Sequence, residues 1–499
     1  GKKMKKKLLS VLLSVAMIST LFAGCGTAEA PAAGDAAAEA PAAEEADDAA
    51  EAPAEDTGSG QNMADADVDV SKLAGTKITV YTHGGNRVLG EEKKDEDGNT
   101  YRDESSAYLT QLAERFTAET GIEVELNVVT NEQEIEPLFK VEDSSVDVFT
   151  PPNWSLAQWE AYSEPYCTIA EASEIYGADY TGSMPNNGTD VFSIMPAKAY
   201  NQCVVYNEEV IKAAGYDEIP ATLEEFNEMC AAIRDMGVTP ISMHRVENWP
   251  LATVQDFAGY VVGNANVLAE CLKEENPFAE DAPFGKTIKI YTQWKADRFF
   301  EQEVYTDFGV AMDSVAYGKA AMMLFGSWVV PQIQGRVPEG TDPSIIKFAP
   351  APDFGAGRYV LAAPADNWAI SKFSENKDAA RAFIEYVSED AQFLADSGFI
   401  ANKKGVEPVV PELYKIIDDA VAAGEVTPLF VPATNDNTLH NQEILEEAGL
   451  WADYKYVGLL FDSLDVTKPD DWSAYEKQVE EQNKLYNDYR DELGYTWED

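Results

Sequence analysis

The sequence predicts an α/β protein with two lobes. Segments that alternate residue by residue between apolar and polar side chains, as strands do, are interleaved with segments of helical periodicity. Strand, helix, strand order is typical of largely parallel sheets covered by helices. About 440 residues follow an N-terminal segment that has no core-forming composition, and one hydrophobic core serves only roughly 250 to 300, so we expect two lobes.

The N-terminal 24 residues have the composition of a secretory signal. Five lysines precede an apolar stretch, residues 8–23, which is shorter than the about 20 residues of a membrane-spanning helix. The segment LFAGC resembles the lipobox of bacterial lipoproteins, although Phe22 replaces the usual small aliphatic residue. We therefore predict residues 1–24 to be a signal peptide and Cys25 to be lipidated. A plain secretory signal is the alternative.

Residues 25–70 are predicted to form a disordered acidic tether. Ala, Pro, Glu and Asp dominate residues 26–60, which contain no aromatic side chain. Such a segment cannot bury a core, and its like charges repel one another. It would hold the folded part away from a lipid anchor at Cys25. This predicts a protein on the extracytoplasmic face of the membrane, attached by its anchor alone.

The overall charge argues against several partners. The chain has 37 basic and 88 acidic residues, a formal net charge of -51, which repels nucleic acid and anionic lipid headgroups. Only three histidines are present, and the cysteines that follow Cys25 are widely spaced, so we expect no metal and no cofactor. These cysteines are predicted to be buried thiols, with a disulfide as the alternative: Cys167, Cys203, Cys230 and Cys271.

The elements of the first half begin with a strand at 77–82, which is rich in β-branched residues. A helix is predicted over 108–120, ended by Gly121, and a strand with strict alternation follows over 122–129. A further strand over 146–151 ends at two prolines. These segments together predict the parallel sheet of the first lobe.

The second half repeats this order. Thr222 and Glu225 have the spacing of a helix N-cap, and the apolar stripe that follows ends at Gly237. A strand over 238–243 comes next, and a later helix is predicted over 377–388. The acidic C-terminal stretch 472–493 is predicted to be a solvated amphipathic helix.

Four segments resemble the extracellular solute-binding proteins of family 1, the group that includes maltose-binding protein. The resemblance spans about residues 75–499, and the order of the segments makes it specific. The segment 83–106 departs from the family because it is longer and more charged. The four segments are LAERFTAETGIEVELNVV, SIMPAKAYNQCVVYNEEVIKAAGYDEIPATLEEFNEMCAAI, YGKAAMMLFGSWVVPQI and APADNWAISKFSENKDAARAFIEYVS.

This resemblance implies a periplasmic-binding-protein-like clamshell of type II, in which the chain crosses three times between two α/β lobes. The implied crossings lie near 196–202, 363–370 and 427–434. Lobe one would comprise 75–196 plus 370–427, and lobe two 197–369 plus 428–499. A solute held between the lobes of a monomer would stabilise the closed form, which the permease subunits of an ABC importer recognise. No catalysis is implied.

The ligand is expected to be a carbohydrate, which aromatic rings would contact by stacking and amide or carboxylate groups by hydrogen bonding. Trp328, in the segment GSW, matches the family position whose indole packs on the sugar. The other candidates lie in loops or crossing segments: Trp154, Trp249, Trp368, Asn153, Asp366, Asn367, Tyr200, Asn201, His83 and Arg87. Each tryptophan has core packing as its alternative, and His83 and Arg87 have a solvated loop. The tryptophans assigned to packing are Trp159, Trp294, Trp451, Trp472 and Trp497.

Other functions are weighed against this one. An exported glycoside hydrolase would need a pair of suitably spaced carboxylates, but 88 acidic residues make some such pair inevitable. The sequence contains no GxSxG, HExxH, Walker A or EF-hand pattern. An alternative ligand for the same clamshell is a polyamine bound through cation–π contacts, a peptide or another solute. An adhesin or signalling role for the same fold is a further alternative.

Overall fold

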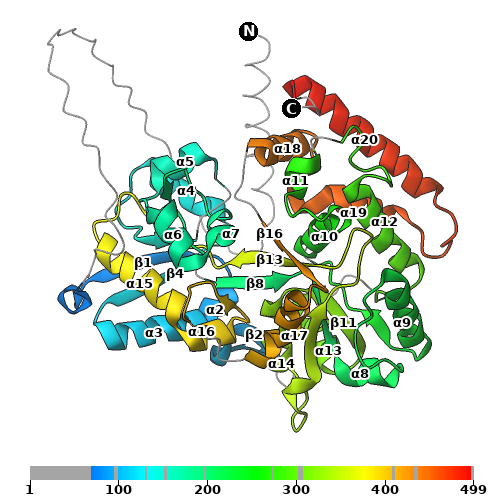
Figure 1. Cartoon of the computed structure of the whole chain (residues 1–499), viewed down its shortest axis with the longest axis horizontal. Helices are drawn as coiled ribbons and strands as arrows, with labels where there is room; N and C mark the ends of the chain where they lie inside the picture. The colour runs from blue at the N-terminus through cyan, green and yellow to red at the C-terminus, as the bar shows by residue number, and fades with distance from the viewer. Residues whose placement is uncertain are drawn as a thin grey trace, which may run out of the picture. The chain divides into compact units, whose positions relative to one another are not determined.

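The computed structural model describes residues 69–495, with short gaps, and Figure 1 shows the order of its elements. The gaps are residues 95–98, 130–131, 151–153, 196, 247, 272–273, 302–306, 407–410 and 432–435. The predicted signal peptide, most of the tether, Cys25, Asn153 and Trp497 lie outside the described residues.

The first sheet contains the predicted strands of the first half, in the order β14-β5-β1-β4. β1 pairs in parallel with both β4 and β5, whereas β14 is antiparallel to β5. Helix α3 covers it with Leu109, Leu112 and Phe116 and ends at Gly121, whose φ is 75°. The bounds are β1 Lys77–Thr82, α3 Tyr108–Thr120, β4 Glu123–Val128, β5 Val148–Phe149 and β14 Ala369–Ile370.

The second sheet has the order β10-β11-β9-β12. Every residue of β9 and β11 is buried, as expected for central strands covered on both faces. β11 is parallel to β10 and antiparallel to β9, which is also antiparallel to β12. The bounds are β9 Cys203–Asn207, β10 Thr239–Ile241, β11 Ala320–Phe325 and β12 Ile346–Pro350.

A third sheet, in the order β15-β8-β13-β16, contains parts of all three segments that were predicted to cross between lobes. β13 is antiparallel to β8 and parallel to β16. Only Gln202 separates β8 from β9, so one strand passes directly into the second sheet. β13 similarly leads into β14 of the first sheet. The bounds are β8 Ala197–Asn201, β13 Tyr359–Ala365, β15 Ile400–Ala401 and β16 Thr427–Phe430.

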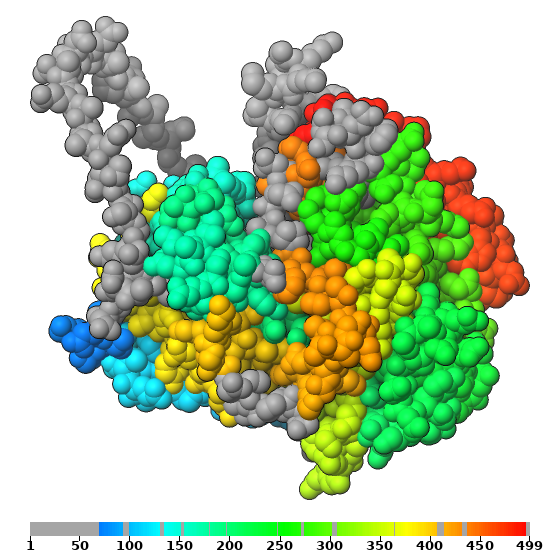
Figure 2. Space-filling view, in the orientation of Figure 1, coloured from blue at the N-terminus to red at the C-terminus, as the bar shows by residue number. Residues whose placement is uncertain are grey.

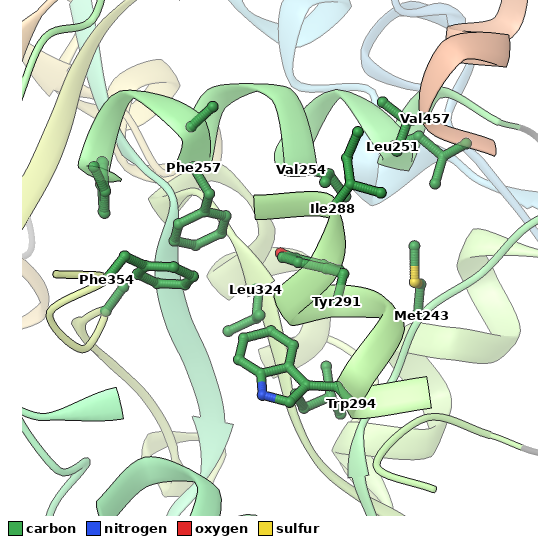
Figure 3. Packing of buried hydrophobic residues seen from close by; sticks show 14 of the residues in the cluster. Met243, Leu251, Val254, Phe257, Ile288, Tyr291, Trp294, Leu324, Phe354 and Val457 are labelled. Atoms are coloured by element: carbon green, nitrogen blue, oxygen red, sulfur yellow. The ribbon is translucent and has the colours of Figure 1, made fainter. Parts of the chain in front are cut away.

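The largest core surrounds the helices that pack beside the second sheet, and Figure 3 shows part of it. Phe257 stacks on Phe354 at 4.8 Å between ring centroids, and Tyr291 lies 4.9 Å from Trp294. Trp294 is buried, and its Nε1 donates to Asn227 Oδ1 at 2.7 Å. The helices are α9 Leu223–Asp235, α10 Ala252–Val262, α12 Pro283–Ala296, α19 Lys455–Ser463 and α20 Ser473–Leu493. The predicted amphipathic helix is α20, which lies on the molecular surface (Figure 2, red).

The predicted helices and most predicted strands are confirmed. Helices α3, α9 and α15 occupy the predicted ranges, and Thr222 Oγ1 accepts from Glu225 N at 3.3 Å as the N-cap. β5 and β10 are shorter than predicted. The remaining elements are α2 Gly85–Leu89, β2 Glu91–Lys94, β3 Thr100–Asp103, α4 Glu136–Lys140, α5 Leu156–Tyr162, β6 Cys167–Thr168, α6 Ile169–Tyr176, α7 Ala178–Thr181, β7 Asp190–Val191, α8 Glu208–Ala213, α11 Val267–Cys271, α13 Phe308–Ala316, α14 Val330–Gln334, α15 Lys377–Glu389, α16 Ala391–Asp396, α17 Pro411–Ala422 and α18 Asp436–Glu447.

Helix α17 packs against the second sheet. Its residues Tyr414 and Ile417 belong to the buried cluster that contains Val205 and Phe348 of that sheet. In the described part of the chain, no helix is both long and apolar enough to cross a bilayer. Cys167, Cys203 and Cys230 are buried free thiols, as predicted.

Candidate functional site

Two of the predicted tryptophans lie next to each other beside the second sheet. Trp328 is in a short 3₁₀ helix, Ser327–Val329, that follows β11, and Trp249 is in another, Trp249–Leu251, that precedes α10. Their ring centroids are 6.2 Å apart, and Phe308 lies 5.2 Å from Trp249 and 5.9 Å from Trp328. Trp249 is 37% exposed and Trp328 is half-buried. Both indoles therefore keep surface that a ligand can contact.

Gly326 allows the Trp328 indole to lie against the side chain of Asn201. A Cβ atom at Gly326 would be 2.0 Å from Asn201 Oδ1 and 2.6 Å from both Cδ1 and Nε1 of Trp328. The backbone of Gly326 is extended, with φ -90° and ψ 171°, so only space requires glycine here. Asn201 ends β8, and this brings an amide beside an aromatic ring.

The chain segment behind Asn201 is held by α10. The Tyr260 hydroxyl lies 3.1 Å from the carbonyl oxygen of Asn201 and 3.0 Å from that of Gln202, and it accepts from Leu361 N at 2.8 Å. Gln202 has a φ of 56°, and its Nε2 donates to Asp256 Oδ2 at 2.7 Å. Burial raises the pKa of Asp256 to about 7, while the bonds from Gln202 and Gln255 oppose the shift.

Tyr200 is turned away from this amide. Its hydroxyl donates to Asp418 Oδ1 at 2.6 Å, and Lys198 Nζ lies 5.2 Å from its ring centroid. Burial and the contact with Asp418 raise its pKa well above the ordinary value. Tyr200 is buried, so its ring and hydroxyl are both occupied by protein groups.

Near the first sheet, Arg87 and Asp366 form a buried ion pair. Arg87 also donates to Thr82 Oγ1 at 2.6 Å, and Asp366 Oδ2 accepts from Trp368 Nε1 at 2.8 Å. The side chains of Arg87 and Asp366 are 8% and 1% exposed. Each charge is neutralised by the other. The pair therefore stabilises the loop after β1, and its charged groups are not available to a ligand.

His83 lies beside this pair and remains exposed. Its Nδ1 is 3.1 Å from Thr150 Oγ1. Surrounding protein desolvates the ring, and with the nearby charge of Arg87 this lowers its pKa to about 4. His83 is therefore neutral near pH 7, an exposed polar group suited to hydrogen bonding. Asn367 lies close in sequence to Asp366, and its Oδ1 is buried with no hydrogen-bond partner among the described residues.

Trp154 and Trp368 lie in cores. Trp154 is 3% exposed, and its ring contacts those of Phe139 and Trp159, each at 5.3 Å. Trp368 is fully buried and lies 6.0 Å from Phe383. Neither ring presents a face to solvent, which agrees with the packing alternative for both. Trp159 and Trp294 are also buried, as assigned.

Asp256, Gln202 and Tyr260 were not among the predicted site residues. The sequence did offer one signal for Asp256. This carboxylate follows a glutamine within the mostly apolar helical segment ATVQDFAGYVV. Among the residues that the structure describes, no cluster of three or more His, Cys, Asp or Glu side chains is arranged to hold a metal ion.

The fold and these groups define a binding protein with a surface of indole and amide groups. Residues 99–392 match the family model of the bacterial extracellular solute-binding proteins, and the chain belongs to this family. No curated protein matches the chain.

Solved structures show the same fold. BlMnBP1, the binding protein of an ABC transporter from Bifidobacterium animalis subsp. lactis, solved with mannobiose, matches with a TM-score of 0.66 and 20% identity over 85% of this chain and 96% of that chain. BlMnBP2 from the same organism, with mannotriose, gives 0.65 and 18% over 85% and 96%. Maltose-bound MalE3 of T. maritima gives 0.57 and 15% over 82% and 99%. The predicted α/β clamshell class of the type II binding proteins is confirmed.

Proposed function

We propose that this protein captures a carbohydrate, an oligosaccharide, and delivers it to the permease of an ABC importer. The observation that carries this proposal is the placement of Trp328 and Trp249, 6.2 Å apart, with the Asn201 amide against the Trp328 ring. Sugar rings stack their C–H faces on indoles and direct their hydroxyls to amides. The chain's family and the sugar-bound structures that share its fold support the same ligand class.

The proposed mechanism is closure of two lobes around the sugar. A ligand that contacts both lobes binds the closed form better, and it shifts the population by that difference in affinity. In the proposed division, lobe one carries the first sheet, with His83 as the polar contact. Lobe two carries the second sheet, with Trp249, Trp328 and Asn201. Closure is sufficient to signal to the permease, so the protein needs no catalytic step.

The proposed location is the extracytoplasmic face of the membrane. Cys25 would carry the lipid after cleavage of residues 1–24, and the acidic segment that follows would tether a monomeric binding domain. A long acidic tether repels anionic headgroups and keeps the domain away from the lipid surface.

Thermal-shift measurements test the ligand class. Mannobiose, mannotriose, maltose and raffinose are compared with spermidine and with a short peptide. A ligand that binds only the native state raises the unfolding midpoint as its concentration rises. We expect such a rise with at least one sugar and none with spermidine. A rise with spermidine alone would replace the carbohydrate proposal with a cation-binding one.

A further inference from the structure

The segment 83–106, which departs from the family pattern, folds as helix α2 followed by a hairpin of β2 and β3. In the hairpin Glu91 pairs with Asp103, and Glu92 with Arg102. Gly90, with a φ of 82°, begins the hairpin, and a Cβ atom there would be 2.5 Å from the carbonyl oxygen of Asp103. This close approach fixes the position of Glu91 relative to α2.

Glu91 is paired with a residue in the segment after α14, the helix that packs on β12 of the second sheet. Arg336 follows α14 and forms ion pairs with Glu91 and with Asp313 of α13, the latter at 2.8 Å. The side chains of Arg336 and Glu91 are 8% and 12% exposed, whereas that of Asp313 is 48% exposed. Arg336 Nη1 also lies 3.4 Å from the carbonyl oxygen of Gly309.

The two partners are attached to different layers of the molecule. Helix α2 contacts α3 and β4 of the first sheet, whereas α13 and α14 contact β11 and β12 of the second. Figure 1 shows β2 and α14 close together at the lower centre, and the ion pair joins β2 to the segment that follows α14. A second contact joins these layers: Ser327 Oγ donates to the carbonyl oxygen of Gly398 at 2.8 Å. Gly398 lies two residues before β15 of the third sheet.

We propose that Glu91 and Arg336 form a latch that holds the two lobes closed in the absence of ligand. This inference rests on the lobe closure of the proposed function. Ser327 and Gly398 lie beside the third sheet, near the expected pivot, so they need not separate when the lobes open. Glu91 is attached to the layer of the first sheet and Arg336 to the layer of the second. Opening of the lobes would therefore separate the two side chains.

The surroundings of Arg336 explain why loss of Glu91 would favour the open form. Arg336 Nε is buried and has no hydrogen-bond partner in the described structure, and the other two guanidinium nitrogens are held by Glu91, Asp313 and the carbonyl oxygen of Gly309. Glu91→Gln leaves Arg336 paired with Asp313, which lies on the same layer as Arg336, so the substitution removes the attraction between the two layers while the Arg336 charge stays compensated. The closed fraction multiplies the intrinsic affinity for a ligand, so a weaker latch also weakens binding.

The test compares Glu91→Gln with Glu92→Gln in the full chain without ligand. Both variants remove one negative charge from the same hairpin. Glu92, however, is exposed, and its ion pair among the described residues is with Arg102 of its own hairpin, at 3.8 Å. Small-angle scattering measures the radius of gyration, and circular dichroism verifies that both variants are folded. We expect Glu91→Gln to expand relative to wild type and Glu92→Gln to remain unchanged.

A second variant separates the latch from a general effect on folding. Combined with Arg336→Met, Glu91→Gln should add no further expansion, because the partner is already absent. A folded Glu91→Gln protein with the wild-type radius, or equal expansion of Glu92→Gln, would overturn the latch. Neither result depends on sugar binding. If mannobiose and mannotriose bind all variants, we expect about fivefold or greater weakening for Glu91→Gln and for the double variant, and wild-type affinity for Glu92→Gln.

Discussion

Replacing Gly326 by alanine adds a single methyl group at the point where Asn201 and Trp328 meet. The new carbon would be 2.0 Å from Asn201 Oδ1 and 2.6 Å from the indole, against the 3.4 Å at which ordinary contact begins. The oxygen must therefore move by about 1.4 Å and the ring by about 0.8 Å. The extended backbone accepts alanine, so the whole effect comes from this crowding.

Overpacking of this kind costs about 1–3 kcal/mol of unfolding free energy. Displacement of the indole from its proposed sugar-stacking position removes a contact worth about 1 kcal/mol, which corresponds to roughly fivefold weaker binding. Urea unfolding followed by circular dichroism measures the first effect, and calorimetry with mannobiose measures the second. We expect both to change together in Gly326→Ala.

Gly335→Ala is the matched control. Gly335 lies on the same segment, its φ is -68°, and the nearest atom to an added Cβ is 3.5 Å away. This variant should unfold and bind like the wild type. If Gly326→Ala matches it in both measurements, the indole and the amide do not meet as described, and the reasoning about the site fails.

Three further outcomes are expected. Trp328→Ala should weaken sugar binding about fivefold or more with an unchanged fold, and unchanged affinity by calorimetry would remove Trp328 from the site. Cys25→Ala should release the protein from membrane fractions, so persistence there would argue against lipidation. Because the folded state binds the Asp256 proton more tightly than the unfolded state, stability should fall as pH rises from about 4 through 7. Asp256→Asn should remove about 2–3 kcal/mol of this fall between about pH 5 and about pH 8, measured by urea unfolding, and an unchanged slope would contradict the assigned pKa.

The fold was predictable because local periodicity and tertiary packing agree over most of the chain. The stripe of α3 and the alternation of β4 follow from residues that lie within one helix or strand. Short strands such as β5 were overestimated, since their ends are set by pairing with distant segments. The packing of α17 on β12 was not predictable, because the partner of an apolar helix face is set by segments that are distant in the sequence.

The site was only partly predictable. Trp328 and Asn201 could be singled out, but nothing in the sequence shows that Gly326 brings them together. Trp154 and Trp368 occupy loop positions that look suitable, yet aromatic neighbours from distant segments enclose them. Whether an indole faces a core or solvent depends on such distant contacts. The residues next to a tryptophan in the sequence do not reveal them.

The contacts of Tyr260 restrict where the lobes can turn. One hydroxyl contacts the end of β8 and also accepts from Leu361 of β13, so both strands are tied to α10 at these points. Lobe rotation within β8 beyond Asn201, or within β13 before Leu361, would break these bonds in a buried environment, at a cost of about 1–3 kcal/mol for each group left unpaired. Turning is cheaper on the side of the first sheet. There Asp366 already has a φ of 62° between β13 and β14, and we expect the bend to be at this residue and its neighbours.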